Sequence, residues 1–480
     1  MTKSTDIRIV DISTTLENIR YRTPMKFGGR VVTDVTLFNV NATVETQDGR
    51  LGKGHGSMPV GNAWGWPSAV EPGDRTLDAM IRLGQLVAAA AGELPQHGHP
   101  IELVHDLSHD YASLAQRVVD QMTLNEGIPR LAQLVSASPI DAAINDAYGD
   151  ALQNNAYNLL SSEHMNRDLG HFLEGKLTGR YLDEFTLRTP KAKMPLYHLI
   201  GALDPLTDSE IDQRLNDGVP ETLGEWIVAD GLTHMKIKLA GDDLEWDVAR
   251  VAAIEKVNLE IQHGRGCEKW WYSTDFNEKC PNVQYLLDFL QRIKEVAPTA
   301  FDRIQYIEQP TNRNLKAYPE NKMHEAAIVK PVVIDESLVD LESLELSREQ
   351  GYSGVALKAC KGHGEALMMG ALAQHYELFL CVQDLTCVGA SFLHSASIAA
   401  RIPSVAAIEG NGRQYCPRGN EGWGDKFPAM FNISDEQAEP HYSTNTAWAI
   451  DYKKPSRTIV EFLARQYFGE VGMSPNLSRF

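Results

Sequence analysis

Eight short apolar segments recur between residues 194 and 408, and this repeat constrains the fold more than any other feature of the sequence. An amphipathic helical pattern follows each segment, and the ionisable residues that mark the last seven segments lie 23 to 39 residues apart. This spacing accommodates one strand with its return helix, and eight such units close into a (β/α)8 barrel. An open doubly wound sheet is the alternative, but no GxGxxG motif follows the first segments. The segments are Met194–Ile200, Leu232–Leu239, Trp270–Phe276, Ile304–Ile307, Val332–Ile334, Val355–Leu357, Leu378–Val382 and Val405–Ile408.

The residues before this repeat have a different pattern. Apolar and polar residues alternate over 7–12 and 32–44, which predicts a small antiparallel sheet. Helical patterns follow over 77–91, 107–122 and 138–160, and Ser138-Pro139 is a common helix start. We therefore expect an N-terminal α+β domain of residues 1–190 and a barrel domain of residues 191–414. The chain then becomes loop-rich until a helical pattern over 455–468.

The chain is acidic, with 45 Lys and Arg against 64 Asp and Glu and a formal net charge of −19. We expect no nucleic-acid partner, because a protein that binds nucleic acid needs clustered basic charge on its surface. No segment approaches the roughly 20 apolar residues that span a bilayer, and the N-terminus lacks the pattern of a secretory signal. The six cysteines include no CxxC pair, which favours reduced thiols over a zinc cluster. These features predict a cytoplasmic protein that binds no membrane.

Two lysines share one face of the segment at residues 232–239. Side chains alternate along a strand, so Lys236 and Lys238 should point into the barrel while Met235, Ile237 and Leu239 face the helices. Burial of two ammonium groups disfavours their charged form, so the pKa of at least one should fall. A lysine with a lowered pKa is a base near neutral pH. A surface strand with two solvated lysines is the alternative.

Acids end three consecutive predicted strands. They are Asp275, which is followed by Asn277 on the same face, then Glu308 and Asp335. The functional groups of a barrel gather at the carboxyl ends of its strands, so these side chains should converge. Because three unpaired carboxylates repel one another, a cation is expected, and hard oxygen ligands suit Mg²⁺. Each acid alone could instead cap a helix or form a salt bridge.

Another lysine, Lys358, ends the next predicted strand, which lies across the barrel from the strand of Lys238. A substrate with an acidic C–H group, held between Lys238 and Lys358, would have one lysine on each face. Such a site suits removal of the proton next to a carboxylate, with a metal neutralising the charge that develops.

Five motifs in this order resemble the enolase superfamily, and within it the muconate-lactonizing-enzyme subgroup of the mandelate racemase/muconate lactonizing enzyme family. The likeness covers nearly the whole chain. It implies a modified barrel, of the β/α7β kind, under an α+β capping domain on which a C-terminal segment of about 415–480 packs. The motifs are Lys236-x-Lys238, Asp275-x-Asn277, Glu308-Gln309-Pro310, Asp335-Glu336-Ser337 and Ala356-Leu357-Lys358.

The resemblance also implies roles for individual residues. Lys238 and Lys358 would be the acid/base pair, and Lys236 would lie near the substrate carboxylate, with Asn277 also in the substrate site. The family further suggests a homo-oligomer. The implied ligands of Mg²⁺ are Asp275, Glu308 and Asp335.

Three positions depart from relatives within this superfamily. Gln383-Asp384 and Lys358 stand where racemases carry a His–Asp dyad, so that dyad is absent. Lys361-Gly362-His363-Gly364 replaces the usual paired glycines. Glu409-Gly410-Asn411 replaces the Asp-x-Asp of dipeptide epimerases, which disfavours a dipeptide substrate. Glu409 would contact the substrate or be a structural acceptor, and Asp384 would pair with Lys358 or with solvent.

Two segments of the N-terminal domain are candidates for substrate selection. Residues 20–29 carry Arg22 and Lys26, which could bind a second acidic group, and glycines that allow movement. Residues 54–67 carry Trp64 and Trp66, which could stack on an apolar or sugar face. For each segment the alternative is ordinary packing against the barrel.

The favoured interpretation is a Mg²⁺-dependent isomerase or lyase. It would abstract the proton α to the carboxylate of a small molecule through an enediolate, with epimerisation or racemisation, cycloisomerisation or acid-sugar dehydration as the outcome. A barrel aldolase with a Schiff base at Lys358 is the second interpretation, although it needs no set of three carboxylates. A metal-binding barrel without catalysis is the third, and the complete acid/base set argues against it.

Overall fold

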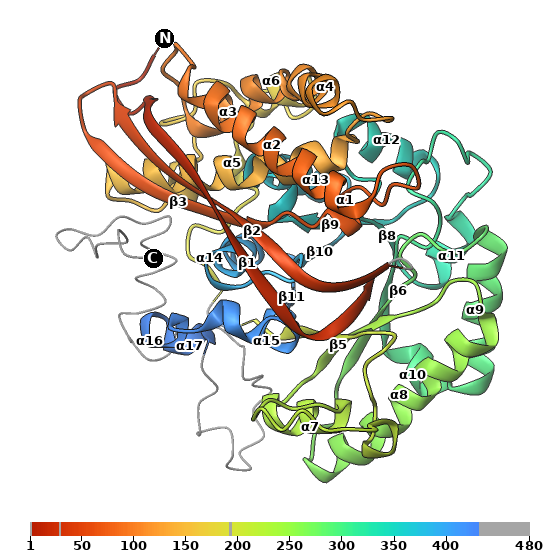
Figure 1. Cartoon of the computed structure of the whole chain (residues 1–480). Coiled ribbons are helices and arrows are strands. Elements are labelled where there is room, and N and C mark those ends of the chain that lie inside the picture. The colour runs from red at the N-terminus through yellow and green to blue at the C-terminus, as the bar shows by residue number, and fades with distance from the viewer. Residues whose placement is uncertain (1, 28–29, 192–193, 432–480) are drawn as a thin grey trace.

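Eight parallel strands close into a barrel in the computed structural model, which describes residues 2–27, 30–191 and 194–431 (Figure 1). Each apolar segment of the sequence coincides with one strand, so the predicted barrel is confirmed and the open sheet is wrong. Three strands separate β5 from β9 on either side, so these two lie opposite each other. The strands are β4 (Leu196–Ile200), β5 (His234–Lys238), β6 (Trp271–Asp275), β7 (Ile304–Glu308), β8 (Val332–Ile334), β9 (Gly354–Lys358), β10 (Phe379–Gln383) and β11 (Ile408–Glu409).

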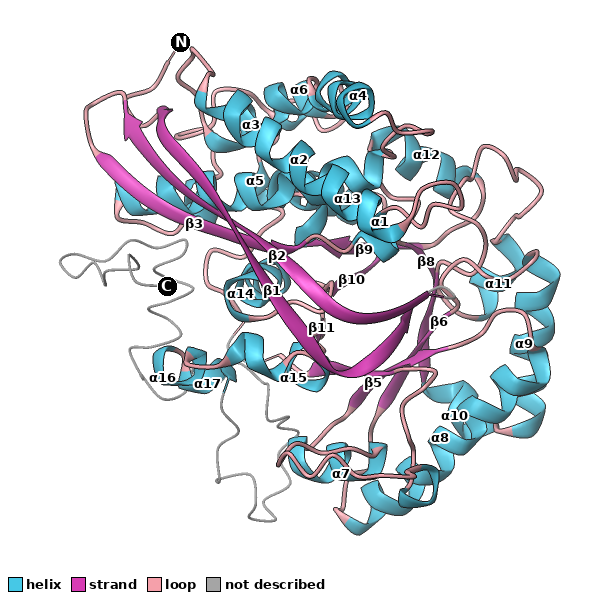
Figure 2. Ribbon diagram, in the orientation of Figure 1, coloured by secondary structure: helices cyan, strands magenta, loops and turns pink. Residues whose placement is uncertain are grey.

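Helices surround the barrel and cover its outward side chains, such as the fully buried Met235 and Ile237 (Figure 2). Among the described residues, no helix has the length and apolar character to cross a membrane. The helices are α7 (Leu223–Asp230), α8 (Leu244–Gly264), α9 (Val283–Val296), α10 (Pro298–Arg303), α11 (His324–Val329), α12 (Leu341–Glu349), α13 (His363–His375), α14 (Gly389–Arg401), α15 (Gly412–Tyr415), α16 (Trp423–Lys426) and α17 (Pro428–Phe431).

The N-terminal capping region is a three-stranded antiparallel sheet covered by helices. Its β1–β2 hairpin extends beyond β3 and reaches across the barrel (Figure 1). On this hairpin, Ile19 and Tyr21 pack with Tyr415 and Cys416, so the described start of the C-terminal segment contacts the cap. The predicted helix at 455–468 lies outside the described residues. The elements are β1 (Ile7–Phe27), β2 (Arg30–Thr46), β3 (Leu51–Pro59), α1 (Asn62–Gly65), α2 (Gly73–Gly92), α3 (Pro100–Ser108), α4 (Tyr111–Met122), α5 (Arg130–Leu152) and α6 (Leu169–Phe172).

Helix α5 begins earlier than predicted, because Pro139 lies inside it rather than at its start. Proline has no N–H to donate to the carbonyl four residues earlier. The hydroxyl of Ser138 donates to that carbonyl, of Val135, at 3.0 Å. Against this helix lie the glycines of β3, and a side chain at Gly54 or Gly56 would overlap the α5 backbone. The helix predicted over 107–122 is also two helices, α3 and α4.

Candidate active site

Lysine Lys236 lies at the centre of the barrel mouth, with 1% of its surface exposed. Its ammonium nitrogen is 2.8 Å from Oε1 of Glu308, 2.9 Å from Oε2 of Glu409 and 3.1 Å from Oδ2 of Asp275. Burial alone would lower the pKa of Lys236, but the three carboxylates outweigh burial and hold it well above its usual value. Lys236 is therefore not a lysine whose pKa falls on burial. Lys238, two residues along β5, also faces the mouth and pairs with Asp275.

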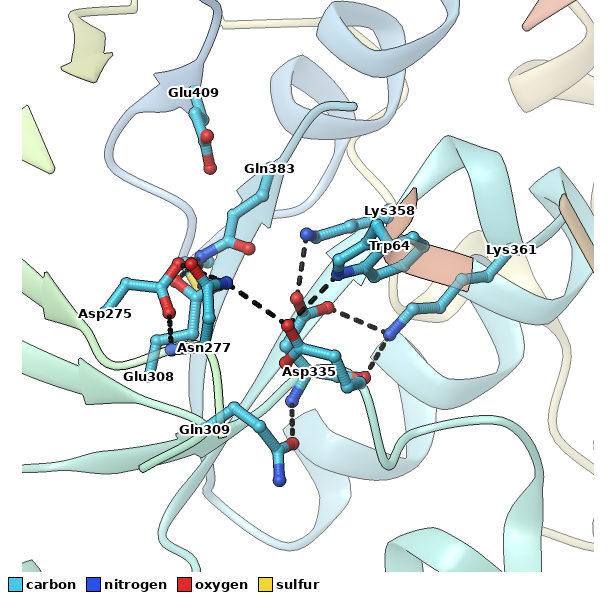
Figure 3. Close-up of polar contacts among 12 residues, drawn as sticks. Trp64, Asp275, Asn277, Glu308, Gln309, Asp335, Lys358, Lys361, Gln383 and Glu409 are labelled. Carbon is cyan, nitrogen blue, oxygen red and sulfur yellow. Dashed lines mark hydrogen bonds and ion pairs between the residues drawn. The ribbon is translucent and has the colours of Figure 1, made fainter. Parts of the chain in front are cut away.

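The three predicted metal ligands end β6, β7 and β8, and all three are fully buried (Figure 3). Each is held by cations or amides. The amide of Gln383 donates to Glu308, while Oδ2 of Asp335 is 2.8 Å from the ammonium of Lys358. Within the described ranges, no three His, Cys, Asp or Glu side chains are grouped so as to hold a metal ion. The fold thus gathers Asp275, Glu308 and Asp335 at one end of the barrel, but their oxygens are directed at protein groups.

Acidic side chains nevertheless outnumber basic ones at the strand ends. Burial and then neighbouring carboxylates raise the pKa of Glu336 to about 7, and burial and then Glu409 raise that of Asp384 to about 8. The pKa of Glu308 is also raised, by burial and then by Asp275. Six buried acids outnumber four buried lysines by two, and without a cation the surplus acids hold protons, as the raised pKa values indicate. This set of hard oxygen donors fits one divalent cation. The acids are Asp275, Glu308, Asp335, Glu336, Asp384 and Glu409, and the lysines are Lys236, Lys238, Lys358 and Lys361.

One tryptophan of the cap covers this site. Trp64 donates from Nε1 to Oε1 of Glu336 at 3.1 Å, and its ring centroid is 4.5 Å from the ammonium of Lys358 and 5.7 Å from that of Lys361. Trp66 lies away from the site, because its Nε1 donates to Glu126 within the cap at 2.8 Å. The structure therefore separates two tryptophans that the sequence treated alike.

Three site residues were not among the sequence candidates. Lys361 lies 3.0 Å from Oδ1 of Asp335, Glu336 accepts from Trp64, and Gln383 contacts Glu308. Each had a signal in the sequence. Glu336 and Gln383 adjoin candidate residues, and Lys361 begins the segment Lys361-Gly362-His363-Gly364, which the sequence analysis singled out.

The remaining candidates differ in position. Arg22 is tied to the barrel by Asp217, at 2.5 and 2.9 Å, while Lys26 is exposed further along the hairpin. Asp384 accepts from the backbone N–H of Cys387 at 2.9 Å, and the described contacts include no ion pair between it and a lysine.

Asn277 holds a neighbouring carboxylate in place. Its backbone N–H donates to Oδ1 of Asp275 at 2.7 Å, and its side-chain amide is 3.4 Å from Glu336.

Comparisons with known proteins agree with this architecture. Residues 219–416 match the family model described as enolase C-terminal domain-like, while no curated protein matches the chain. The L-Ala-D/L-Glu epimerase of Bacillus subtilis is 15% identical, over 85% of this chain and 91% of its own, with a TM-score of 0.56. Muconate lactonizing enzyme from Pseudomonas fluorescens, complexed with muconolactone, is 18% identical over 84% and 87%, with a TM-score of 0.52. A dipeptide epimerase from Enterococcus faecalis, complexed with Mg and L-Leu-L-Tyr, is 15% identical over 85% and 92%, with a TM-score of 0.54. At such identities these structures show the fold alone.

Proposed function

Because residues 219–416 belong to the C-terminal domain family of the enolase superfamily, we propose that this chain is a Mg²⁺-dependent isomerase or lyase acting on a small carboxylate. It removes the proton α to the carboxylate and passes through an enediolate form of the substrate. The observation that carries the proposal is the placement of two buried lysines, Lys238 and Lys358, on opposite strands of one barrel. Epimerisation, cycloisomerisation and dehydration share this first step.

The proposed roles follow from the positions of the side chains. Lys238 and Lys358 face the substrate from opposite sides, so one removes the proton and the other can return it. Lys236, which is buried on the same face of β5 as Lys238, would bind the substrate carboxylate. We also propose that the protein is a homo-oligomer, as the family resemblance suggests.

The metal would be held by Asp275, Glu308 and Asp335. When bound, Mg²⁺ would neutralise charge that develops on the substrate carboxylate and would engage the carboxylates that otherwise keep the lysines protonated. The excess of two buried acids over buried lysines at the strand ends supports this assignment.

Calorimetric titration with Mg²⁺ tests the proposal. The wild type should bind the ion, and Asp275→Asn and Asp335→Asn should not, whereas Asp302→Asn, a change at an acid outside the site, should bind as the wild type does. Acid sugars, hydroxy acids and N-acylated amino acids would then be screened for α-proton exchange in deuterated water. A wild type that binds no Mg²⁺ would contradict the proposal, and borohydride trapping at Lys358 would then test the Schiff-base alternative.

A further inference from the structure

An arginine of the barrel, Arg313, reaches the part of the cap that carries Trp64. It lies in the loop between β7 and α11, beyond Glu308 at the end of β7. Its Nη1 donates to the backbone carbonyl oxygen of Trp64 at 3.0 Å. This hydrogen bond joins residues 249 positions apart and ties the cap to a loop at the mouth of the barrel.

The carbonyl of Trp64 lacks a donor from the residues that follow it. Trp64 lies in the four-residue helix α1, and the last carbonyl groups of a helix have no partner within it. Pro67 has no N–H to donate. Among the described contacts, the N–H of Ser68 donates to the carbonyl of Trp66 instead, at 2.8 Å. Arg313 therefore supplies a hydrogen bond that the helix itself cannot make.

A glutamate of the neighbouring loop fixes the direction of this arginine. Glu278, in the loop after β6, accepts from Nε of Arg313 at 2.8 Å and from Nη2 at 2.6 Å. It also accepts from the backbone N–H of Arg313 at 2.9 Å. Paired bonds of this kind hold the planar guanidinium group in one orientation. Only 23% of the arginine side chain and 16% of the glutamate side chain are exposed, so water competes little for these bonds.

The loop that carries Glu278 is in turn bound to the loop of Arg313. The backbone N–H of Glu278 donates to the carbonyl of Gln309 at 2.8 Å, and that of Cys280 donates to the carbonyl of Pro310 at 2.9 Å. The backbone of Glu278 has a φ of 61°, a left-handed conformation that a residue other than glycine keeps only where its surroundings impose it. The two loops thus present Glu278 and Arg313 to the cap as one unit.

Trp64 is consequently held at two points. Arg313 binds its backbone, and Glu336 accepts from its indole nitrogen at 3.1 Å. Between these contacts the ring lies 4.5 Å from the ammonium of Lys358 (Figure 3). In this position Trp64 and Lys358 each have 4% of their surface exposed. Movement of the ring would uncover Lys358.

We propose that Arg313, held by Glu278, is a positioning residue that keeps Trp64 in place over Lys358. Without the bond from Arg313, the backbone of Trp64 is free to move and its indole leaves Glu336 more often. A role for this movement in turnover, as the step that admits the substrate, rests on the proposed function. The position of Trp64 belongs to the protein without substrate.

Exchange of the indole hydrogen of Trp64 with water measures how often this ring leaves its place. The full chain, labelled with ¹⁵N in its eight tryptophans, is studied by NMR without metal or substrate, and Trp64→Phe assigns the signal. Arg313→Met should speed exchange at Trp64 about tenfold or more, because loss of a hydrogen bond from a charged donor changes an equilibrium by roughly that factor. Trp66 and Trp270, whose indoles donate to other groups, should keep their wild-type rates.

Three further variants distinguish this role from a general effect on folding. Glu278→Gln leaves Arg313 in place but removes the charge that fixes it, so exchange at Trp64 should again be faster. Arg313→Lys keeps a donor for the carbonyl without the paired bonds, and should give a rate between those of the wild type and Arg313→Met. The matched control Arg292→Met, at an exposed arginine paired with Glu245, should leave every rate unchanged.

An unchanged rate at Trp64 in both Arg313→Met and Glu278→Gln would overturn the proposal. Equal acceleration at Trp64, Trp66 and Trp270 would also overturn it, because the substitution would then have loosened the whole protein. Failure of the proposed function would appear separately, as a lack of Mg²⁺ binding or of α-proton exchange by the wild type, and would leave the indole rates unaffected.

Discussion

The ammonium of Lys358 lies 2.8 Å from Oδ2 of Asp335, which ends the neighbouring strand of the barrel. Burial alone would lower the pKa of this lysine, but Asp335 outweighs burial and raises it above its usual value. In this ion-paired arrangement Lys358 is therefore an acid and not a base. The carboxylate of Asp335, a proposed metal ligand, thus also controls the pKa of Lys358, the residue proposed to move the proton.

Replacement of either proposed acid/base lysine should abolish α-proton exchange. Lys238→Ala and Lys358→Ala each remove a group that contributes roughly 10²- to 10⁴-fold to proton transfer. Both variants should still bind Mg²⁺ in calorimetry, because neither lysine is a proposed ligand. Deuterium incorporation followed by NMR measures the exchange, with Lys316→Ala, at an exposed lysine, as the matched control. Wild-type exchange in Lys358→Ala would mean that this lysine is not a base.

The raised pKa of Glu336 should make the protein without metal less stable as the pH rises. Its carboxyl group has a pKa of about 7 when folded and an ordinary value when unfolded, so the folded state binds more protons between these values. Stability from this group is present below pH 4 and is lost by pH 8, by an amount on the order of 3 kcal/mol. Glu336→Gln should remove that part of the dependence.

Urea unfolding at pH 5 and pH 8 in the presence of EDTA measures this effect. The loss of unfolding free energy between the two pH values should be smaller in Glu336→Gln than in the wild type. Glu342→Gln, at an exposed position, should behave as the wild type. Equal losses in all three proteins would show that Glu336 does not titrate in this range.

Alternation along the strands explains why much of the site could be predicted. Lys236 and Lys238 share a face of β5, and that face must be the inner one because Met235 and Ile237 are apolar. Lys361 lies beyond the end of β9, where the alternation of a strand no longer predicts where a side chain points. Only the three-dimensional structure shows that its ammonium reaches Asp335.

Local patterns were less informative in the cap. Trp64 and Trp66 lie two residues apart around a short helix, so one reaches Glu336 and the other the interior of the cap. Ser138-Pro139 resembled a helix start, but Pro139 lies inside α5. There the hydroxyl of Ser138 donates to the carbonyl that proline cannot serve, a contact that the sequence pattern does not specify.

Arg22 should hold the β1–β2 hairpin on the barrel. Its guanidinium donates to Asp217 and to the backbone carbonyl oxygens of Val219, at 2.8 Å, and Pro220, at 3.1 Å. Hydrogen bonds that involve a charged group contribute about 1.5–3 kcal/mol each when buried, and the partial exposure of Asp217 reduces its share. Arg22→Met should therefore release the hairpin locally while the fold persists.

Hydrogen–deuterium exchange read by mass spectrometry measures this release. Protection should fall in peptides covering residues 19–26 and 215–221 and stay unchanged in α5. Arg82→Met, at an arginine on the exposed face of α2 bonded only to Gln121 among the described contacts, is the matched control. Full protection of the hairpin in Arg22→Met would mean that other contacts hold it.

Ser138 and Pro139 should be coupled in their effect on stability. Ser138→Ala removes a hydroxyl that donates to the buried carbonyl of Val135, and an acceptor left unsatisfied in this way costs about 1–3 kcal/mol. In a Pro139→Ala background, the new backbone N–H can donate to this carbonyl, so the same change should cost less. A double-mutant cycle of urea unfolding should give a coupling of about 1 kcal/mol, with Ser136→Ala, whose hydroxyl donates to Ala132, as the uncoupled control. Additive costs would mean that the hydroxyl of Ser138 does not replace the donor that proline lacks.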